Sequence, residues 1–578
     1  MIRIKCHNQR ALFDEWAFLG DKRRQLLSHS WASLFREHLL QTLPVREMMP
    51  FFSQRTGRPT KELYTVLGTL LLQQVHDLTD LETVEALAFN IQWHYALNLT
   101  EDSDAVKYLC PKTLWSMRKI LVENALDQVL FDRTTMMLSK VFSVDTAKQR
   151  LDSVHIRSNM ARLGRIRIFA HAIHAFLKNL KRHSPQDFAK LDSELVNRYF
   201  DKKALGCFSM IKPSASAATL SALSSELFDL VRRFEDHEAI SRMRTFLQLK
   251  RILSEQCRVV EDTVEVKPSK EVPSDSLQNP SDPDAGYSAH KGQGYQIQIM
   301  ETYQERTPED PRPSLNLITH VAVEPAHHHD STALIPAIES ASQRGLGPQQ
   351  VLADALYGSD DNLTDAATKG VELISPVMGE KPGKILITDF TFDDTHHVLT
   401  CPMGHAPVKQ KMKKGRYSVA FAKERCAPCP HVASCPVKAS KRYFYLRFEE
   451  KHLRLDQRRA MEKTDAFKER YRYRAGIEAT FSEYDRKTGV KHLRVRGLEK
   501  VRFCAVLKAV GVNLFRAARV WAQRTLETGQ ILAKSRPDFY SYAAFCNFKE
   551  RFVAFFNKSC VPVSANADDY LNPAQHAA

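Results

Sequence analysis

An alternation of strand-like and helix-like segments between residues 294 and 376 constrains the fold more than any other feature of the sequence. Residues 294–300 alternate apolar and polar side chains, which is typical of a strand, and residues 315–323 predict a second strand. The pattern that follows predicts helices over 331–344 and 362–369 and strands over 350–353 and 371–376. Because strands and helices alternate, we predict an α/β fold with a mixed sheet and flanking helices.

The remaining segments suggest how the chain is divided. Residues 142–154 are β-prone and predict the first strand, and a helical pattern follows it and ends in a Pro-, Ser- and Asp-rich stretch, 264–284, that we expect to be a flexible linker. The predicted parts are a helical N-terminal region (1–140), the first part of a core (141–158), a helical insertion with its linker (159–284), the second part of the core (285–394), a Cys-rich basic insertion (395–445), the C-terminal helices of the core (446–525) and a tail (526–578).

Two successive helices are predicted near the N-terminus. Residues 63–75 carry leucines at helical spacing, and Thr79 to Glu82 form a capping-box pattern before a second helical run that reaches Leu97. Two helices joined by a short polar turn are compatible with a helix-turn-helix DNA-binding module, and Arg55 and Arg58 just ahead of them with an arm that enters a minor groove. A plain helical bundle with a solvated loop explains the same pattern.

The charge balance favours a polyanionic partner. The chain has 83 Lys and Arg against 67 Asp and Glu, a formal net charge of +16, although a basic enzyme without a nucleic acid partner has the same balance. The densest basic stretch, residues 491–502, predicts contacts with a DNA phosphate backbone, and a solvated basic helix face is the alternative. The residues that we expect to bind DNA there are Lys491, Arg494, Arg496, Lys500 and Arg502.

Cysteine usage and hydropathy suggest a cytoplasmic protein. The first residues lack the apolar core of a signal peptide, and we find no long uncharged apolar run, so we expect no membrane association and a location near the DNA of a bacterial cytoplasm. Eleven cysteines in such a chain predict reduced thiols or metal ligands. The spacing of Cys401, Cys426, Cys429 and Cys435 is compatible with structural Zn²⁺, with ordinary thiols as the alternative.

Three separated acidic residues suggest a metal-dependent phosphoryl-transfer site. If residues 471–478 form one helix, Tyr471 and Glu478 share nearly one face, with Arg474 one turn before the glutamate. Asp152 and Asp354 each end a short β-prone apolar run, where we expect a strand to present them at a sheet edge. Carboxylates suit Mg²⁺, and two such ions can activate an attacking oxygen and stabilise the leaving one. Each residue alone would be interpreted as a cap or a surface ion pair.

Several motifs carry a family resemblance over about residues 50–520. They are Gly57-Arg-Pro-Thr60, Leu151-Asp-Ser-Val-His-Ile-Arg-Ser-Asn159, His290-Lys-Gly-Gln-Gly-Tyr295, His329-Asp-Ser331, Ala353-Asp-Ala-Leu-Tyr-Gly358 and Tyr471-x2-Arg474-x3-Glu478. In these motifs the chain resembles bacterial insertion-sequence transposases of the DDE type, most of all the insertion sequence 1182 group. One position departs from the family pattern: seven residues after the glutamate, where a basic residue is expected, the chain has Asp485, followed by Arg486.

The resemblance implies a ribonuclease-H-like catalytic core with an acidic triad at Asp152, Asp354 and Glu478, which would hold two Mg²⁺ or Mn²⁺ ions. Arg474 and Tyr471 would position phosphate. We therefore expect a transposase that binds its element's terminal inverted repeats, as a homodimer, cleaves DNA and joins the 3′-hydroxyl ends to target DNA. The alternatives are a ribonuclease-H-like nuclease that does not join strands, and an inactive relative that acts as a DNA-binding repressor.

Overall fold

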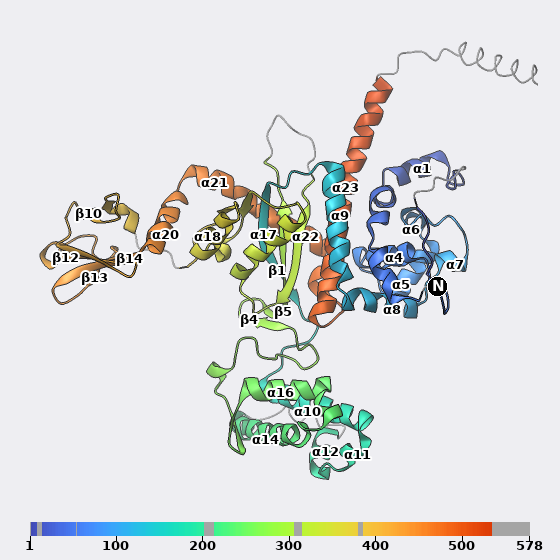
Figure 1. Ribbon diagram of the computed structural model, residues 1–578, viewed down its shortest axis with the longest axis horizontal. Helices are drawn as coiled ribbons and strands as arrows, with labels where there is room; N and C mark the ends of the chain where they lie inside the picture. The colour runs from blue at the N-terminus through green and yellow to red at the C-terminus, as the bar shows by residue number, and fades with distance from the viewer. Residues whose placement is uncertain are drawn as a thin grey trace, which may run out of the picture. The chain divides into compact units, whose positions relative to one another are not determined.

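A mixed six-stranded sheet forms the centre of the fold (Figure 1). The computed structural model describes residues 2–7, 14–53, 55–200, 213–305, 315–379 and 385–534. They fall into a unit of residues 1–520 and a second unit, 521–578, of which the end of one helix is described; the rest of the predicted tail lies outside the described residues. The strands of the sheet are β1 (Lys148–Arg157), β4 (Gly286–Ser288), β5 (Gly292–Thr302), β6 (Ile318–Pro325), β7 (Gln350–Leu352) and β8 (Glu372–Ile374).

The sheet combines an antiparallel part with a parallel part. The strand order is β4-β5-β1-β7-β8, and β6 also pairs with β5. Strand β5 is antiparallel to β1, β4 and β6, whereas β7 is parallel to both β1 and β8. The predicted strands and the mixed α/β class are therefore confirmed.

Helices cover both faces of this sheet. Helices α17 (Leu334–Gln343) and α18 (Asp360–Thr368) pack in one apolar cluster with Leu151, which is paired with Met300. Their neighbours Arg150 and Glu301 point to the opposite face because side chains alternate along a strand. There the structure places helices α22 (Gly476–Thr488) and α23 (Leu498–Lys534), whose Thr480 and Arg516 contact Glu301.

The N-terminal region is helical, as predicted. Helix α4 (Leu63–Val75) matches its predicted bounds, and Thr79 and Glu82 form the predicted capping box of α5 (Asp80–Phe89). The second predicted run does not reach Leu97 as one helix, because Asn90 ends α5 and caps α6 (Ile91–Ala96). The other α-helices described in this region are α1 (Asp21–Ser28), α2 (Trp31–Leu34), α3 (Val45–Met48), α7 (Asp104–Lys107), α8 (Pro111–Glu123) and α9 (Leu126–Phe142), and a π-helix, η1 (Phe35–Leu39), follows α2.

The insertion after β1 is a helical block with its own apolar cluster. Its elements are α10 (Arg165–His183), α11 (Pro185–Ala189), α12 (Ser193–Phe200), α14 (Ser216–Phe234), α15 (Glu238–Ser241), α16 (Arg244–Gln256) and the hairpin of β2 (Cys257–Val260) and β3 (Thr263–Val266). The predicted flexible linker is wrong for much of 264–284. It begins within β3, and its Asp282 is 1% exposed and accepts hydrogen bonds from Ser158 and Tyr295.

The Cys-rich segment contains a second sheet that the sequence did not predict. Its order is β11-β12-β14-β13, all antiparallel, and a short hairpin of β9 and β10 precedes it. The bounds are β9 (Thr391–Phe392), β10 (Val398–Thr400), β11 (Lys409–Lys413), β12 (Arg416–Ala422), α19 (Lys423–Cys426), β13 (Lys438–Ala439) and β14 (Tyr443–Glu449). Helices α20 (Glu450–Met461) and α21 (Asp465–Tyr471) lead back toward α22.

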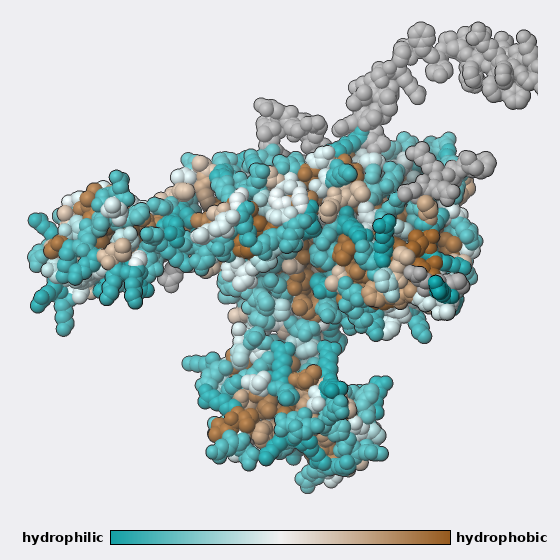
Figure 2. Space-filling view, viewed as in Figure 1, coloured by the Kyte–Doolittle hydropathy of each residue, from teal (hydrophilic) through white to brown (hydrophobic). Residues whose placement is uncertain are grey.

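The visible surface is mainly hydrophilic. Figure 2 shows teal over most of this face, with small brown patches scattered among polar side chains. None of the helices described is long and apolar enough to cross a membrane.

Candidate active site

Two of the predicted acidic residues lie beside each other because of the β1–β7 register. Strand β7 ends at Leu352, which is paired with Arg150, so two residues further along each chain Asp152 and Asp354 are level. Asp152 is in the middle of β1, which corrects the expectation that its strand ends there. At Asp152, β1 has no strand partner on the β7 side, because β7 ends at Leu352. Asp354 begins the short 3-10 helix η7 (Ala355–Tyr357), and its Oδ1 accepts from Leu356 N at 2.9 Å.

The third acidic residue, Glu478, lies on helix α22, and Arg474 contacts all three acids. The Arg474 guanidinium donates to Asp152 Oδ2, and its Nη2 lies 3.9 Å from Asp354 Oδ2. Its Nη1 lies 3.3 Å from Glu478 Oε1, so the predicted pair at i, i+4 is present. The structure therefore brings Asp152, Asp354 and Glu478 around one guanidinium.

Residues 471–478 are not one α-helix, contrary to the prediction. Helix α21 ends at Tyr471, the 3-10 helix η9 (Arg472–Ala475) follows, and α22 begins at Gly476. The tighter turn fits against β1, where Arg150 Nη1 donates to the Tyr473 carbonyl at 2.7 Å. A Cβ added at Gly476 would lie 2.0 Å from the same Arg150 Nη1, so this approach requires glycine.

Burial and crowded negative charge dominate the electrostatics. Burial raises the pKa of Asp152 to about 7; Arg474 opposes the rise, whereas Asp354 and Glu478 add to it. Burial also raises the pKa of Asp354. Glu478 is more open, with 63% of its side chain exposed. Where three carboxylates share one cation, one acid is expected to be protonated, and the cation partly neutralises the charge of the other two.

The oxygen donors of this cluster suit a hard divalent cation. Within the ranges that the structure describes, no three His, Cys, Asp or Glu residues are arranged closely enough to hold a metal ion, and the Arg474 guanidinium lies between the three carboxylates. The chemistry of the donor set therefore fits Mg²⁺ or Mn²⁺, while its spacing requires Arg474 to move aside from the acids.

Tyr471 packs beside the carboxylates in an apolar cluster. Its ring stacks on Phe467 with centroids 5.4 Å apart, and the cluster includes Leu352 and Ile374 at the ends of β7 and β8. Burial raises its pKa, and Arg474 opposes the rise. The hydroxyl stays protonated at neutral pH, so it is suited to donate a hydrogen bond.

The position that departs from the family pattern does not contact the carboxylates in the structure. Asp485 Oδ1 accepts from the Lys491 backbone N at 3.1 Å, and Arg486 Nε donates to the Ser482 carbonyl at 3.3 Å. Nearby Glu483 forms ion pairs with Lys487 and Arg516, at 2.7 Å each.

Lys291 and Asp330 lie near the triad and were not assigned a role from the sequence. Lys291 Nζ lies 3.1 Å from Ser153 Oγ, next to Asp152, and 3.4 Å from Asp330 Oδ2. Both belong to motifs that carry the family resemblance, which was the available signal.

The four predicted zinc ligands come together as free thiols. Cys401, Cys426, Cys429 and Cys435 line one small cavity with His405 and His431. Burial raises the pKa of Cys426 to about 11, and the three other cysteines add to the rise. Thiols this weakly acidic become ligands when a metal displaces their protons. The structure shows the gathering of the cysteines but not a closed ligand set.

The three predicted DNA-binding arginines of the basic stretch 491–502 have partners within the chain. Arg494 pairs with Asp77 at 2.9 Å, Arg502 with Asp127 at 3.1 Å, and Arg496 Nε donates to Asn159 at 3.0 Å. Asp127 is fully buried, so Arg502 stabilises the fold rather than standing free for phosphate. Arg55, Arg58 and Lys500 are exposed, and Lys491 is partly exposed.

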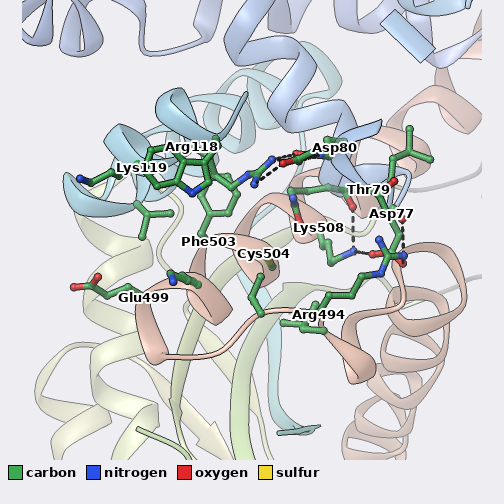
Figure 3. Close-up of a pocket in the computed structure, with 18 of the residues that line it drawn as sticks. Asp77, Thr79, Asp80, Arg118, Lys119, Arg494, Glu499, Phe503, Cys504 and Lys508 are labelled. Carbon is green, nitrogen blue, oxygen red and sulfur yellow. Dashed lines mark hydrogen bonds and ion pairs between the residues drawn. The ribbon is translucent and has the colours of Figure 1, made fainter. Parts of the chain in front are cut away.

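A cavity lies along the basic stretch 491–502, away from the carboxylate cluster. Figure 3 shows Phe503 and Lys508 of α23, with Arg494 in the loop before it, facing Arg118 of α8 and Asp77 of the α4–α5 turn around a space of about 570 Å³. Its acidic residues Asp77 and Asp80 are ion-paired, to Arg494 and Lys508 and to Arg118. The basic stretch thus joins the N-terminal helices to α23.

Two family models match the chain. A model of a transposase DDE domain matches residues 400–518, and a model of a transposase domain (DUF772) matches residues 24–119. These matches show a transposase of the DDE type. Arg474 and Glu478 lie within the first match, whereas Asp152 and Asp354 lie outside both. The family implies use of a divalent metal and DNA as the partner. No curated protein matches this transposase.

Proposed function

We propose that this transposase binds the terminal inverted repeats of an insertion sequence, cleaves DNA by two-metal hydrolysis and transfers the 3′-hydroxyl ends to target DNA. The observation that carries the proposal is the meeting of Asp152, Asp354 and Glu478 around Arg474, from segments 202 and 124 residues apart. Three carboxylates from distant segments at the end of a sheet suit metal-assisted phosphoryl transfer.

The sheet supports a ribonuclease-H-like core. Strands β1, β5 and β6 form an antiparallel meander, and β7 and β8 add parallel strands on the other side of β1. The helical block enters between β1 and β4, and the second sheet enters between β8 and α20. Residues 1–140 would bind DNA, with the α4–α5 pair as a helix-turn-helix and Arg55 and Arg58 as its arm. We assign the chain to the insertion sequence 1182 group on the motifs given above.

In this proposal Asp152, Asp354 and Glu478 would hold two Mg²⁺ or Mn²⁺ ions, which would supply an activated oxygen nucleophile and neutralise charge on the leaving oxygen. The protein would position the DNA. Arg474, displaced from the three carboxylates, would bind a phosphate oxygen, for which its planar fork is suited. Tyr471, held by Phe467, would donate a hydrogen bond from its hydroxyl to a second phosphate oxygen.

The remaining assignments complete the proposal. Lys491, Arg496 and Lys500 contact the DNA backbone, and Cys401, Cys426, Cys429 and Cys435 hold a structural Zn²⁺. The protein acts as a homodimer on DNA, because two element ends must be brought together. Its compartment in this proposal is a bacterial cytoplasm.

Strand-transfer products test the function. Purified protein, linear DNA bearing the inverted repeats that flank the gene, a target plasmid and Mg²⁺ should yield joined products, and Asp354→Asn protein should not. Cleavage without joining would favour the nuclease alternative. Tight binding to the repeats without cleavage by the wild-type protein would favour the repressor.

A further inference from the structure

The motifs around Lys291 and Asp330 meet in space although 39 residues separate these two residues. Lys291 lies in the turn between β4 and β5. Gly292 follows it with φ +90°, a conformation that favours glycine, and a Cβ at Gly294 would lie 2.0 Å from the Ile156 carbonyl. Gly292 is therefore needed for the conformation of the turn, and Gly294 for the close approach of β5 to β1. The motif builds a turn that holds one lysine over the strand of Asp152.

Asp330 orients this lysine from the other side. Its side chain is 8% exposed, and its Oδ1 accepts from Gln298 Nε2 at 3.1 Å while its Oδ2 faces Lys291. Tyr357, just after Asp354, donates to Gln298 Oε1 at 2.6 Å, so the same amide connects Asp330 with the loop of the second triad acid. Asp330 is thus fixed in place before any ligand binds.

The lysine retains capacity for a further ligand. Its ammonium has three donors, and the structure uses two of them, on Ser153 and Asp330. The side chain is 35% exposed. A lysine needed only to neutralise Asp330 would not also have to reach the residue next to Asp152.

The face of β1 beside Lys291 carries further polar side chains. His155 and Arg157 follow Ser153 on one face of β1. Neither ring nitrogen of His155 has a hydrogen-bond partner among the residues that the structure describes. Burial, then Lys291 and Arg157, lower the pKa of His155 to about 4, so the ring is neutral and can donate one hydrogen bond. Ser153, His155 and Arg157 share the face of β1 opposite Asp152, because side chains alternate along a strand.

We propose that Lys291 binds a phosphate of the DNA strand next to the bond held at the triad, with Asp330 as its positioning residue. Charge complementarity, and the connection of Asp330 through Gln298 to Tyr357 in the loop of Asp354, select a phosphodiester as the occupant. The inference rests on the proposed function for the identity of the strand, and it adds a DNA-binding residue to the site.

Salt-dependent binding tests the phosphate contact. We would titrate full-length Lys291→Ala with a short labelled DNA duplex of arbitrary sequence over a range of salt concentrations. Loss of one phosphate contact should reduce the slope of log affinity against log salt by about 0.9, and Lys291→Arg should keep the wild-type slope. The matched control is Lys369→Ala, which removes another ion-paired lysine, bound to Glu339 at 2.6 Å.

An unchanged slope in Lys291→Ala, or the same decrease in Lys369→Ala, would overturn the proposal. Equal unfolding temperatures of wild type, Lys291→Ala and Lys291→Arg guard against a folding defect. Asp330→Asn keeps the lysine charge, so it should retain the slope but require more DNA for half-maximal cleavage, with recovery in Asp330→Glu. If wild-type protein and Asp354→Asn alike leave inverted-repeat DNA uncut, the proposed function fails, whereas the slope still decides the phosphate contact.

Discussion

The Arg150 guanidinium packs against Gly476, at the start of the helix that carries Glu478. Arg150 is held there by its ion pair with the fully buried Glu301, at 2.6 Å, which Arg516 of α23 also contacts at 2.8 Å. Thr480, two residues after Glu478 in α22, lies 2.8 Å from both Glu301 carboxylate oxygens. The contacts of the buried Glu301 with Arg150, Arg516 and Thr480 therefore fix the position of α22 and of Glu478.

Gly476→Ala should displace Glu478. The added Cβ would contact Arg150 Nη1 at 2.0 Å, and the arginine cannot retreat without losing Glu301. A shift of about 1 Å at a catalytic group can cost roughly 100-fold in rate, which is the decrease in cleavage that we expect. Gly164→Ala is the control, because nothing lies within 4 Å of its Cβ position. Normal cleavage by Gly476→Ala would mean that the network does not set the site.

Asp152→Asn, Asp354→Asn and Glu478→Gln should each lower cleavage by about 1,000-fold or more, since loss of one metal ligand removes several kcal/mol of transition-state stabilisation. Binding to inverted-repeat DNA should be largely retained, as measured by a gel-shift titration. Asp365→Asn, an exposed acid on α18, is the control. If Glu478→Gln cleaves normally, the third ligand is elsewhere, and Glu483 is the first residue to examine despite its ion pairs.

Mg²⁺ binding should weaken below about pH 7. Burial raises the pKa of Asp152 to about 7, so protons compete with the metal for this carboxylate at lower pH. The apparent affinity should fall up to about tenfold per pH unit below 7 and level off above pH 8. The stabilisation of the protein by Mg²⁺ in thermal unfolding, measured across pH 5.5–8.5, checks this. In Asp152→Asn the step at pH 7 should be absent.

The same shift has a consequence for the metal-free protein. Because the pKa of Asp152 is higher in the folded state than the ordinary value of 3.8, the folded state binds this proton more tightly. The free energy of unfolding contributed by this group therefore falls as pH rises from about 4 to 7 and is constant above. Wild-type protein without divalent metal should lose stability over this window, and Asp152→Asn should lose less.

Arg502→Ala and Arg496→Ala should have different effects. Arg502 pairs with the fully buried Asp127, whose pKa is raised by burial, so its removal leaves a buried acid alone and should cost about 3 kcal/mol in unfolding free energy. Arg496 is exposed and bonds an amide, so its removal should instead lower the salt slope of DNA binding by about 0.9. Urea unfolding and salt titration of both variants separate the two roles. A lower slope in Arg502→Ala at unchanged stability would contradict this division.

The purified transposase should carry about one equivalent of zinc. Cys401, Cys426 and Cys435 pack against the apolar core of the small β11–β14 sheet, and all four cysteines line one cavity. Metal analysis of Cys426→Ser, Cys429→Ser protein should show the loss of zinc, and Cys504→Ser, a buried cysteine in α23, should retain it. Zinc-free protein isolated under reducing conditions would assign all four to ordinary thiols.

Local patterns predicted the local structure well. The leucine spacing predicted α4 with its observed bounds, the Thr79–Glu82 box caps α5, and the β-prone segments predicted the strands of the central sheet except β4. Asp152, Asp354 and Glu478 were chosen with the help of the family motifs, and the structure brings them together. Their chemical roles remain predictions.

What the sequence did not predict depends on contacts between distant residues. No local pattern indicates that Arg150 needs a glycine 326 residues later, or that Arg502 pairs with Asp127 across 375 residues. The same reason explains the wrong helix over 471–478, because η9 forms where Tyr473 meets Arg150. In the Cys-rich segment, the prolines and cysteines interrupt the sequence pattern of strands, and cross-strand pairing stabilises the strands that form there.

The place where the helical block leaves and rejoins the sheet bears on how such a chain can change. Ser158 at its start and Asp282 near its end share a hydrogen bond, and Asp282 also receives Tyr295 of β5. For β1 and β5, the whole block is therefore the loop of an antiparallel hairpin. Since closing a longer loop costs little more free energy than closing a shorter one, the block can grow, shrink or be exchanged without disturbing Asp152. The sheet would conserve the chemistry while the loop diversifies.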